Sequence, residues 1–92
     1  MTKANNNDDE LFNFPCQFPI KIMGRCDCDL EALAVEIIKR HVSGIEKDAV
    51  VTRPSGKGNF MSVTVTITAS SRAQLDNIYL ELTAQKEVLM AL

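Results

Sequence analysis

The sequence is short of the residues on which catalysis, metal binding and disulfide frameworks depend. Its 92 residues include no tryptophan, one tyrosine, one histidine and three cysteines. No run approaches the roughly 20 apolar residues that a membrane-spanning helix needs. Three cysteines are too few, and odd in number, for the disulfide framework of a secreted protein. These shortages predict a reduced, cytoplasmic protein that does not enter the membrane.

Positive charge is also scarce. Ten lysines and arginines stand against twelve aspartates and glutamates, which gives a formal net charge of −2. A protein that binds polyanions regardless of their sequence needs clustered lysine and arginine to release counterions. The charge balance therefore argues against nucleic acid as a partner. A chain of this length forms one domain, whose core is too small to enclose a large substrate cavity.

The chain divides into a tail and a domain. Residues 1–10 are rich in asparagine and aspartate and lack the apolar core of a signal peptide, so we expect a flexible polar tail. Residues 11–92 form the predicted domain. We expect Phe12 or Phe14 to pack against its core just before the first strand.

Apolar periodicity predicts the elements of this domain. Strands are expected at residues 18–23, 49–53, 60–69 and 88–92. A first helix begins at Asp27 or Asp29 and runs to about Val42. Its apolar stripe comprises Leu30, Leu33, Ala34, Ile37 and His41, with Ile38 at the margin. A second helix begins at Ser71, where Gln74 completes a capping box.

The order of these elements is strand-helix-strand-strand-helix-strand. It predicts an α+β, ferredoxin-like βαββαβ fold, with a four-stranded antiparallel sheet and both helices on one face. Residues 60–69 alternate between apolar side chains and mostly hydroxyl side chains. An antiparallel sheet needs only one apolar face, so the other face is expected to lie open to solvent.

The Cys26-Asp-Cys28 segment suggests a metal site in which Cys16 and His41 are further ligands. Ligands of one zinc ion lie within about 4 Å of each other. His41 is 13 to 15 residues further along the helix, which corresponds to roughly 20 Å. Cys16 is separated from Cys26 by a strand, again roughly 20 Å or more. We therefore expect no metal and no cofactor, and we interpret the cysteines as small, partly buried apolar residues. A reactive thiol at the helix start is the alternative.

His41 is the only histidine. Its place in an apolar stripe predicts a packed side chain that bonds to backbone or interacts with the helix end. A general base needs a nucleophile or an orienting carboxylate beside it, and the stripe of this helix offers neither. We therefore expect a protein that is not an enzyme.

The glycine-rich segment 55–59 resembles a phosphate-binding loop, but it lacks the spacing of a Walker A loop and leads into a strand. We expect a hairpin turn, with an anion nest formed by Lys57 and Arg53 as the alternative. The segment from Lys57 to Phe60 also resembles the strand-three signature of an RNA-recognition motif. Such motifs stack bases on aromatics of strands one and three, whereas here Phe60 stands alone and strand one offers Lys21 and Met23.

The second helix carries a further stripe of small or apolar residues on its expected solvent side: Ala73, Asn77, Leu80 and Ala84. Scattered exposed apolar residues are normal on protein surfaces. The alternative is a docking stripe for a partner helix or a second copy of the chain, so a homodimer is one expected assembly.

Several short motifs, in this order, carry a family resemblance: Phe14-Pro-x-x-Phe18, Lys21-x-Met23-Gly24, Arg40-His41-x-x-Gly44, Ser55-x-Lys57-Gly58-Asn59-Phe60-x-Ser62-Val63 and Tyr79-x-Glu81-Leu82. From about Leu11 to Leu92, the chain resembles the YbeD-like family of small bacterial proteins. The resemblance implies a ferredoxin-like fold similar to that of ACT domains, which sense amino acids and other small ligands. It implies no enzyme activity, cofactor or catalytic residue. The Cys26-Asp-Cys28 segment departs from the usual family pattern.

Likeness to ACT domains places a ligand near the loop after strand one. Gly24, Arg25 and Asp27 are the counterpart of that loop in this chain. With the rest of residues 21–27 and the glycine-rich turn, the candidate ligand-binding residues are Lys21, Gly24, Arg25, Asp27, Ser55, Lys57, Gly58, Asn59 and Phe60. We predict a non-enzymatic regulatory or adaptor domain that binds a small metabolite or a protein partner. An RNA-binding module that uses the open sheet face is the alternative.

Overall fold

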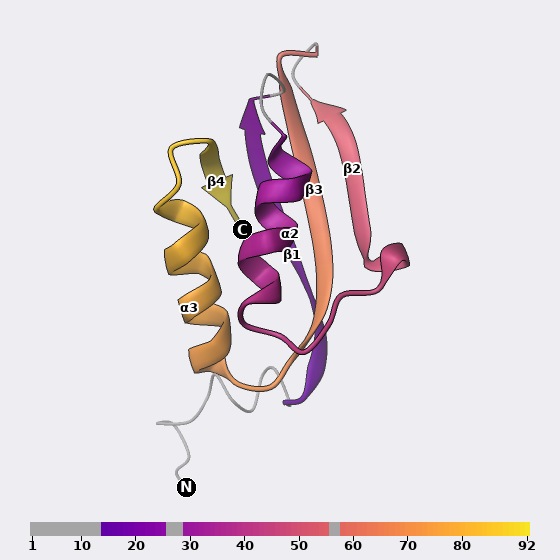
Figure 1. The fold of residues 1–92 in the computed structure, drawn as a ribbon, viewed down its shortest axis with the longest axis vertical. Helices are drawn as coiled ribbons and strands as arrows, with labels where there is room; N and C mark the ends of the chain where they lie inside the picture. The colour runs from indigo at the N-terminus through magenta and orange to yellow at the C-terminus, as the bar shows by residue number, and fades with distance from the viewer. Residues whose placement is uncertain (1–13, 26–28, 56–57) are drawn as a thin grey trace, which may run out of the picture.

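The computed structural model describes residues 14–25, 29–55 and 58–92 (Figure 1). The elements, in chain order, are β1 (Cys16–Arg25), α2 (Leu30–Lys39), the short 3-10 helix η2 (Lys47–Ala49), β2 (Val50–Ser55), β3 (Phe60–Ala69), α3 (Arg72–Thr83) and β4 (Val88–Ala91). This order confirms the predicted α+β class. The predicted tail, residues 1–10, and Phe12 lie outside the described residues.

The four strands form one sheet in the order β2-β3-β1-β4, and all neighbours are antiparallel. Both helices lie on the same face of this sheet (Figure 1). The predicted ferredoxin-like arrangement is confirmed. The two central strands, β1 and β3, are paired along their full length, from Cys16 opposite Ala69 to Arg25 opposite Phe60.

The core lies between the sheet and the helices, where alternate strand residues meet the apolar stripe of each helix. Its buried members are Ile20, Ile22, Leu30, Ala34, Ile37, Ile38, Val63, Val65, Ile67, Ala69, Leu75, Ile78, Leu82 and Val88. Phe14 is partly buried against this cluster, as predicted for one of the first two phenylalanines. Ile38, expected at the margin of its stripe, is fully buried, because α2 packs against α3 as well as against the sheet.

Several boundaries differ from the prediction. Strand β2 was expected at residues 49–53 and spans Val50–Ser55, because Ala49 ends the 3-10 helix η2. Helix α2 ends at Lys39 rather than near Val42, because the chain tightens there into shorter-range bonds. The backbone N–H of His41 donates to the oxygen of Ile38, three residues earlier, at 2.9 Å. Strand β1 extends two residues beyond the predicted range at each end, because β3 offers backbone partners along all ten of its residues.

Candidate functional site

The face of the sheet turned away from the helices is defined by the strand register. Val51 pairs with Thr64, and Thr64 pairs with Lys21. Lys21 and Leu92 exchange two backbone hydrogen bonds, of 3.0 and 2.8 Å. Directly opposite residues place their side chains on the same face of a sheet. These four residues therefore form a row that crosses the full width of the sheet.

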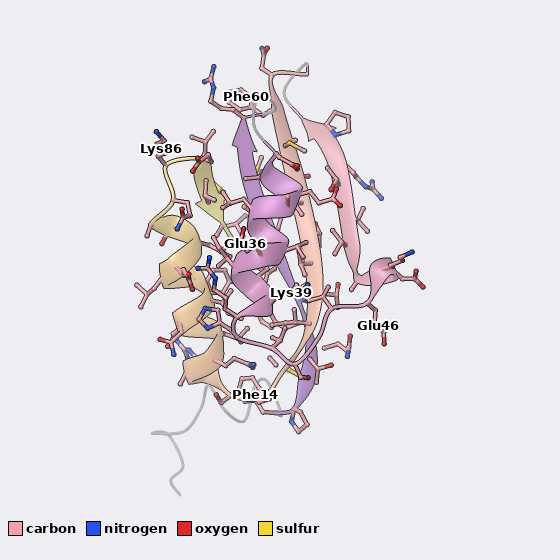
Figure 2. All side chains as sticks on the ribbon, in the orientation of Figure 1. Phe14, Glu36, Lys39, Glu46, Phe60 and Lys86 are labelled. Carbon is pink, nitrogen blue, oxygen red and sulfur yellow. The ribbon has the colours of Figure 1, made fainter. Side chains whose placement is uncertain are left out.

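A second row lies beside the first and contains Arg53, Ser62, Met23 and Met90, paired in that order across the four strands. Phe60 lies opposite Arg25 at one end of the same face, and Figure 2 places Phe60 and Phe14 at opposite ends of the sheet. We call the open face the surface made by Gln17, Pro19, Lys21, Met23, Arg25, Val51, Arg53, Phe60, Ser62, Thr64, Thr66, Thr68, Met90 and Leu92.

Charge and apolar surface are distributed unevenly in the described part of the chain. The open face contains three basic residues and no acidic one. The described acidic side chains lie elsewhere: Glu31 and Glu36 belong to α2 and Asp76 to α3, and others lie in the connecting segments. Four of the five large apolar side chains that are exposed come from β2 or the C-terminal segment: Val51, Leu89, Met90 and Leu92. An acidic protein thus presents one basic and partly apolar surface.

Gly24, predicted to bind ligand, lies on the helix side of β1 and is buried. A Cβ atom there would be 2.5 Å from the backbone oxygen of Glu87 and 3.0 Å from a methyl group of Leu30. Only glycine allows the turn before β4 to approach β1 this closely. Lys21 belongs to the open face, so the sheet separates it from the surroundings of Gly24. Ligand binding by these residues stays a prediction.

The predicted 55–59 turn connects two antiparallel strands, since Ser55 pairs with Phe60. Gly58 has a φ of 88°, which explains a glycine at this position. Gly58 and Asn59 are exposed, whereas Phe60 is half-buried. Lys57 lies outside the described residues, as do Asp27, Cys26 and Cys28. A ligand site at this turn stays a prediction.

The candidate docking stripe on α3 lies where it was predicted. Ala73, Asn77, Leu80 and Ala84 are all exposed, and the side chain of Leu80 is 69% exposed. Apart from Leu80, the residues of the stripe have small side chains, so they offer a partner little surface to pack against. Partner binding there stays a prediction.

A charged cluster joins the two helices, and sequence reasoning missed it. His41 Nε2 lies 2.7 Å from Glu81 Oε1. Arg40 pairs with the other carboxylate oxygen of Glu81 and, at 3.3 Å, with Glu36. The orienting carboxylate that the helix of His41 does not supply comes from the neighbouring helix α3. The sequence did contain a clue, because Arg40, His41 and Glu81 all belong to the two motifs Arg40-His41-x-x-Gly44 and Tyr79-x-Glu81-Leu82.

Hydrogen bonding by His41 and the nearby Arg40 charge lower the pKa of Glu81, although partial burial opposes the shift. Gln74 ties the same region together. Its Nε2 donates to the backbone oxygen of His41 at 2.7 Å, and its Oε1 accepts from the backbone N–H of Ser70 at 2.6 Å. Ser71 accepts from the N–H of Gln74, as predicted for the cap. The Gln74 side chain bonds to Ser70 rather than back to the N–H of Ser71, so the reciprocal half of the predicted capping box is displaced by one residue. The cluster therefore anchors the end of α2 to α3.

Two shallow hollows lie beside this cluster. One, of about 290 Å³, is lined by His41, Ser43, Thr68 and Gln74 among others. The other, of about 150 Å³, shares Gly44 and Thr68 with the first. Both are only partly enclosed. Hydroxyl and amide side chains border the first, whereas Glu46, Ala49 and Ile67 also line the second. Within the described ranges, no three histidine, cysteine, aspartate or glutamate side chains are placed to hold one metal ion.

Comparisons with known proteins match almost the whole chain. A family model described as "Protein of unknown function (DUF493)" matches residues 9–92. A UPF0250 protein of Chromobacterium violaceum is 47% identical over 83 residues, which are 90% of this chain and 93% of that protein. A UPF0250 protein of Neisseria meningitidis serogroup C is 37% identical over 92 residues, the full length of both chains.

Proposed function

This chain belongs to the DUF493 (UPF0250) family of bacterial proteins, and we propose that it is a non-enzymatic adaptor domain that binds a protein partner through its open face. The predicted resemblance to the YbeD-like family is confirmed by this membership. The names of the relatives state no activity, so the proposal does not rest on them. It comes from the uneven surface of the sheet.

The observation that carries the proposal is the pair of residue rows across the open face. They combine Lys21 and Arg53 with apolar side chains at both edges of the sheet, Val51 on one side and Met90 and Leu92 on the other. Met90 and Leu92 are 47% and 61% exposed. Met90 and Leu92 lie two residues apart on the same face at one edge of the sheet, and exposed apolar side chains that lie together mark interaction sites. Lys21 and Arg53 add positive charge to the same surface, which favours a partner of opposite charge.

The arrangement of His41 supports a non-enzymatic role. Its Nε2 is engaged by Glu81, whose other oxygen is engaged by Arg40. No hydroxyl or thiol of the described residues is hydrogen-bonded to His41. A histidine that activates a nucleophile must contact it directly or through one water molecule. The cluster is better suited to holding two helices together. Among the residues that the structure describes, neither α2 nor α3 is long and apolar enough to cross a membrane.

A matched pair of charge reversals tests the proposal. Lys21→Glu changes the open face, whereas Lys39→Glu makes the same change at the C-terminal end of α2, where Lys39 is exposed (Figure 2). Each variant would be immobilised and exposed to bacterial lysate, and retained proteins would be quantified by mass spectrometry. We expect Lys21→Glu to lose a partner that the wild type and Lys39→Glu retain. Equal retention by all three would contradict the use of the open face.

A small metabolite is the other ligand class that the fold favours, and the 290 Å³ hollow beside His41 is where it would bind. Small-molecule sites normally enclose most of their ligand. This hollow is small and only partly enclosed, which makes a metabolite the weaker candidate. A ligand that binds only the native state raises the melting temperature. Thermal-shift screening with amino acids at millimolar concentration tests this. A clear rise in the melting temperature would favour a metabolite sensor over an adaptor.

RNA is a second candidate for the open face, and one observation favours it. Phe60 lies opposite Arg25 on a surface with three basic and no acidic described residues. A base could stack on the Phe60 ring while the phosphates contact Lys21 and Arg53. This model predicts salt-sensitive binding of a single-stranded RNA oligonucleotide and a loss of binding in Phe60→Ala. Unchanged binding in that variant would remove the stacking model.

A further inference from the structure

The two edges of the sheet are protected to different degrees. An edge strand presents unpaired backbone groups, and proteins usually block these with charged side chains or proline. Edge strand β2 contains both, Arg53 and Pro54. Edge strand β4 reads Val88-Leu-Met-Ala91 and contains neither. Its Leu89 and Met90 are 57% and 47% exposed. Strand β4, which is four residues long and lies beside α3 in Figure 1, is therefore an edge that carries no charged side chain or proline of its own.

The hydrogen-bond pattern shows which backbone groups β4 presents outwards. Lys21 and Leu92 exchange both of their backbone bonds. In an antiparallel pair, bonded and non-bonded residue pairs alternate, so the next pair, Ile22 and Ala91, does not exchange bonds. The N–H and C=O of Ala91 therefore point away from β1. No described residue lies on that side of β4 in the sheet.

Resting on the proposed function, we infer that β4 binds an extended, acidic segment of the partner as a fifth strand. Backbone hydrogen bonds to Ala91 supply the attachment, as in other cases of strand addition. Side chains of an added strand alternate between the two faces. One set would lie over the open face beside Met90 and Leu92, and the other on the helix side beside Ala91.

The positive charge of the open face indicates that the added segment is acidic. Lys21 lies in the same row as Leu92 and is exposed. Lys86 and Glu87, in the turn before β4, have opposite charges that offset each other. An added strand thus meets a net positive potential on the open face, which favours carboxylates at alternate positions. A second copy of this chain would bring another basic face to the same edge, so charge favours an acidic segment over self-association.

The probe is an end-capped peptide of four Glu-Val repeats, and the control is four Lys-Val repeats with the same alternation. Each would be titrated into the ¹⁵N-labelled full chain by NMR. We expect the Glu-Val peptide to shift the amides of Leu89 and Ala91 and to slow hydrogen exchange at Ala91. We expect the Lys-Val peptide to leave both unchanged. No binding of the Glu-Val peptide at millimolar concentration, or shifts confined to β2 or α3, would overturn the inference.

Three variants test the backbone contact itself. Ala91→Pro removes the outward N–H without removing a bond to β1, a position where an edge strand tolerates proline. Ala91→Ser keeps the N–H and serves as its control. We expect Ala91→Pro to weaken Glu-Val binding by about tenfold or more, which corresponds to about 1.4 kcal/mol. Should Ala91→Pro fold poorly, Leu89→Lys decides, because it puts a blocking charge on the edge through an exposed side chain.

The same variants separate this inference from the proposed function. If Lys21→Glu loses the partner but neither Ala91→Pro nor Leu89→Lys does, the adaptor proposal holds and strand addition is rejected. A second copy of the chain is the other possible occupant of β4. Sedimentation of the chain without peptide shows whether such a dimer forms. A dimer that Leu89→Lys dissociates would mean that β4 pairs with a second copy, which would also overturn the inference. Binding of RNA at β4 in place of the acidic peptide would do the same.

Discussion

The two faces of the central strands are built from alternate residues of the same ten-residue segments, yet they are constrained in different ways. On the helix side, Ile20 and Ile22 of β1 are fully buried. Between them, Lys21 is exposed on the open face. The covered face is fixed by packing, which leaves little choice of residue. The open face is free of that demand, so its basic and apolar character calls for another explanation, and binding is the one we propose.

The largest expected effect is a difference in the free energy of unfolding between substitutions at two adjacent residues, one on each face. Ile22→Ala removes a fully buried side chain of the core and should lower the free energy of unfolding by about 2–5 kcal/mol. Lys21→Ala, next to it on the exposed face, should change that free energy by no more than about 0.5 kcal/mol. Urea unfolding followed by circular dichroism measures both. If Lys21→Ala lowered the free energy of unfolding by more than about 2 kcal/mol, the open face would also be needed for stability, and the two faces would not differ in this way.

A smaller effect is expected where the covered face meets the turn before β4. In Gly24→Ala, the new methyl group would lie 2.5 Å from the backbone oxygen of Glu87, so β1 or the turn must move. Such overpacking costs about 1–3 kcal/mol. Gly44→Ala is the control, because a Cβ atom there meets nothing within 4 Å. Equal unfolding free energies for the two variants would show that the turn yields without strain.

Much of the covered face could be predicted from the sequence, because burial on one side of a strand leaves a period-two pattern. Residues 60–69 were predicted as a strand and β3 spans the same ten residues. The end of α2 was predicted less well, since the residues that contact the tight turn at His41, Glu81 and Gln74 of α3, are distant in the sequence. The basic character of the open face was hidden because the whole-chain charge of −2 averages both faces.

The contact between Glu81 and His41 escaped prediction for a related reason. The two residues are 40 positions apart and come from different helices, so only the fold brings them together. Apolar periodicity identifies which face of a helix is buried, but not which polar groups meet at its border. The clue lay in two motifs that carry the family resemblance, and it needed the packing of α2 on α3 to be interpreted.

The smallest expected effect concerns this helix border and appears as a pH dependence. The pKa of Glu81 is lowered by the His41 hydrogen bond and the Arg40 charge, so the carboxylate stabilises the folded state above its unfolded-state pKa. That stabilisation is lost as the pH falls through the lowered, folded-state pKa. Glu81→Gln removes the titrating group and should flatten this part of the dependence. Asp76→Asn is the control, since its contact with Arg72 stays within α3 and is exposed. Thermal unfolding between neutral and acidic pH measures the difference. If the wild type, Glu81→Gln and Asp76→Asn all lose stability in parallel as the pH falls, the ionised carboxylate of Glu81 does not stabilise the packing of α2 against α3.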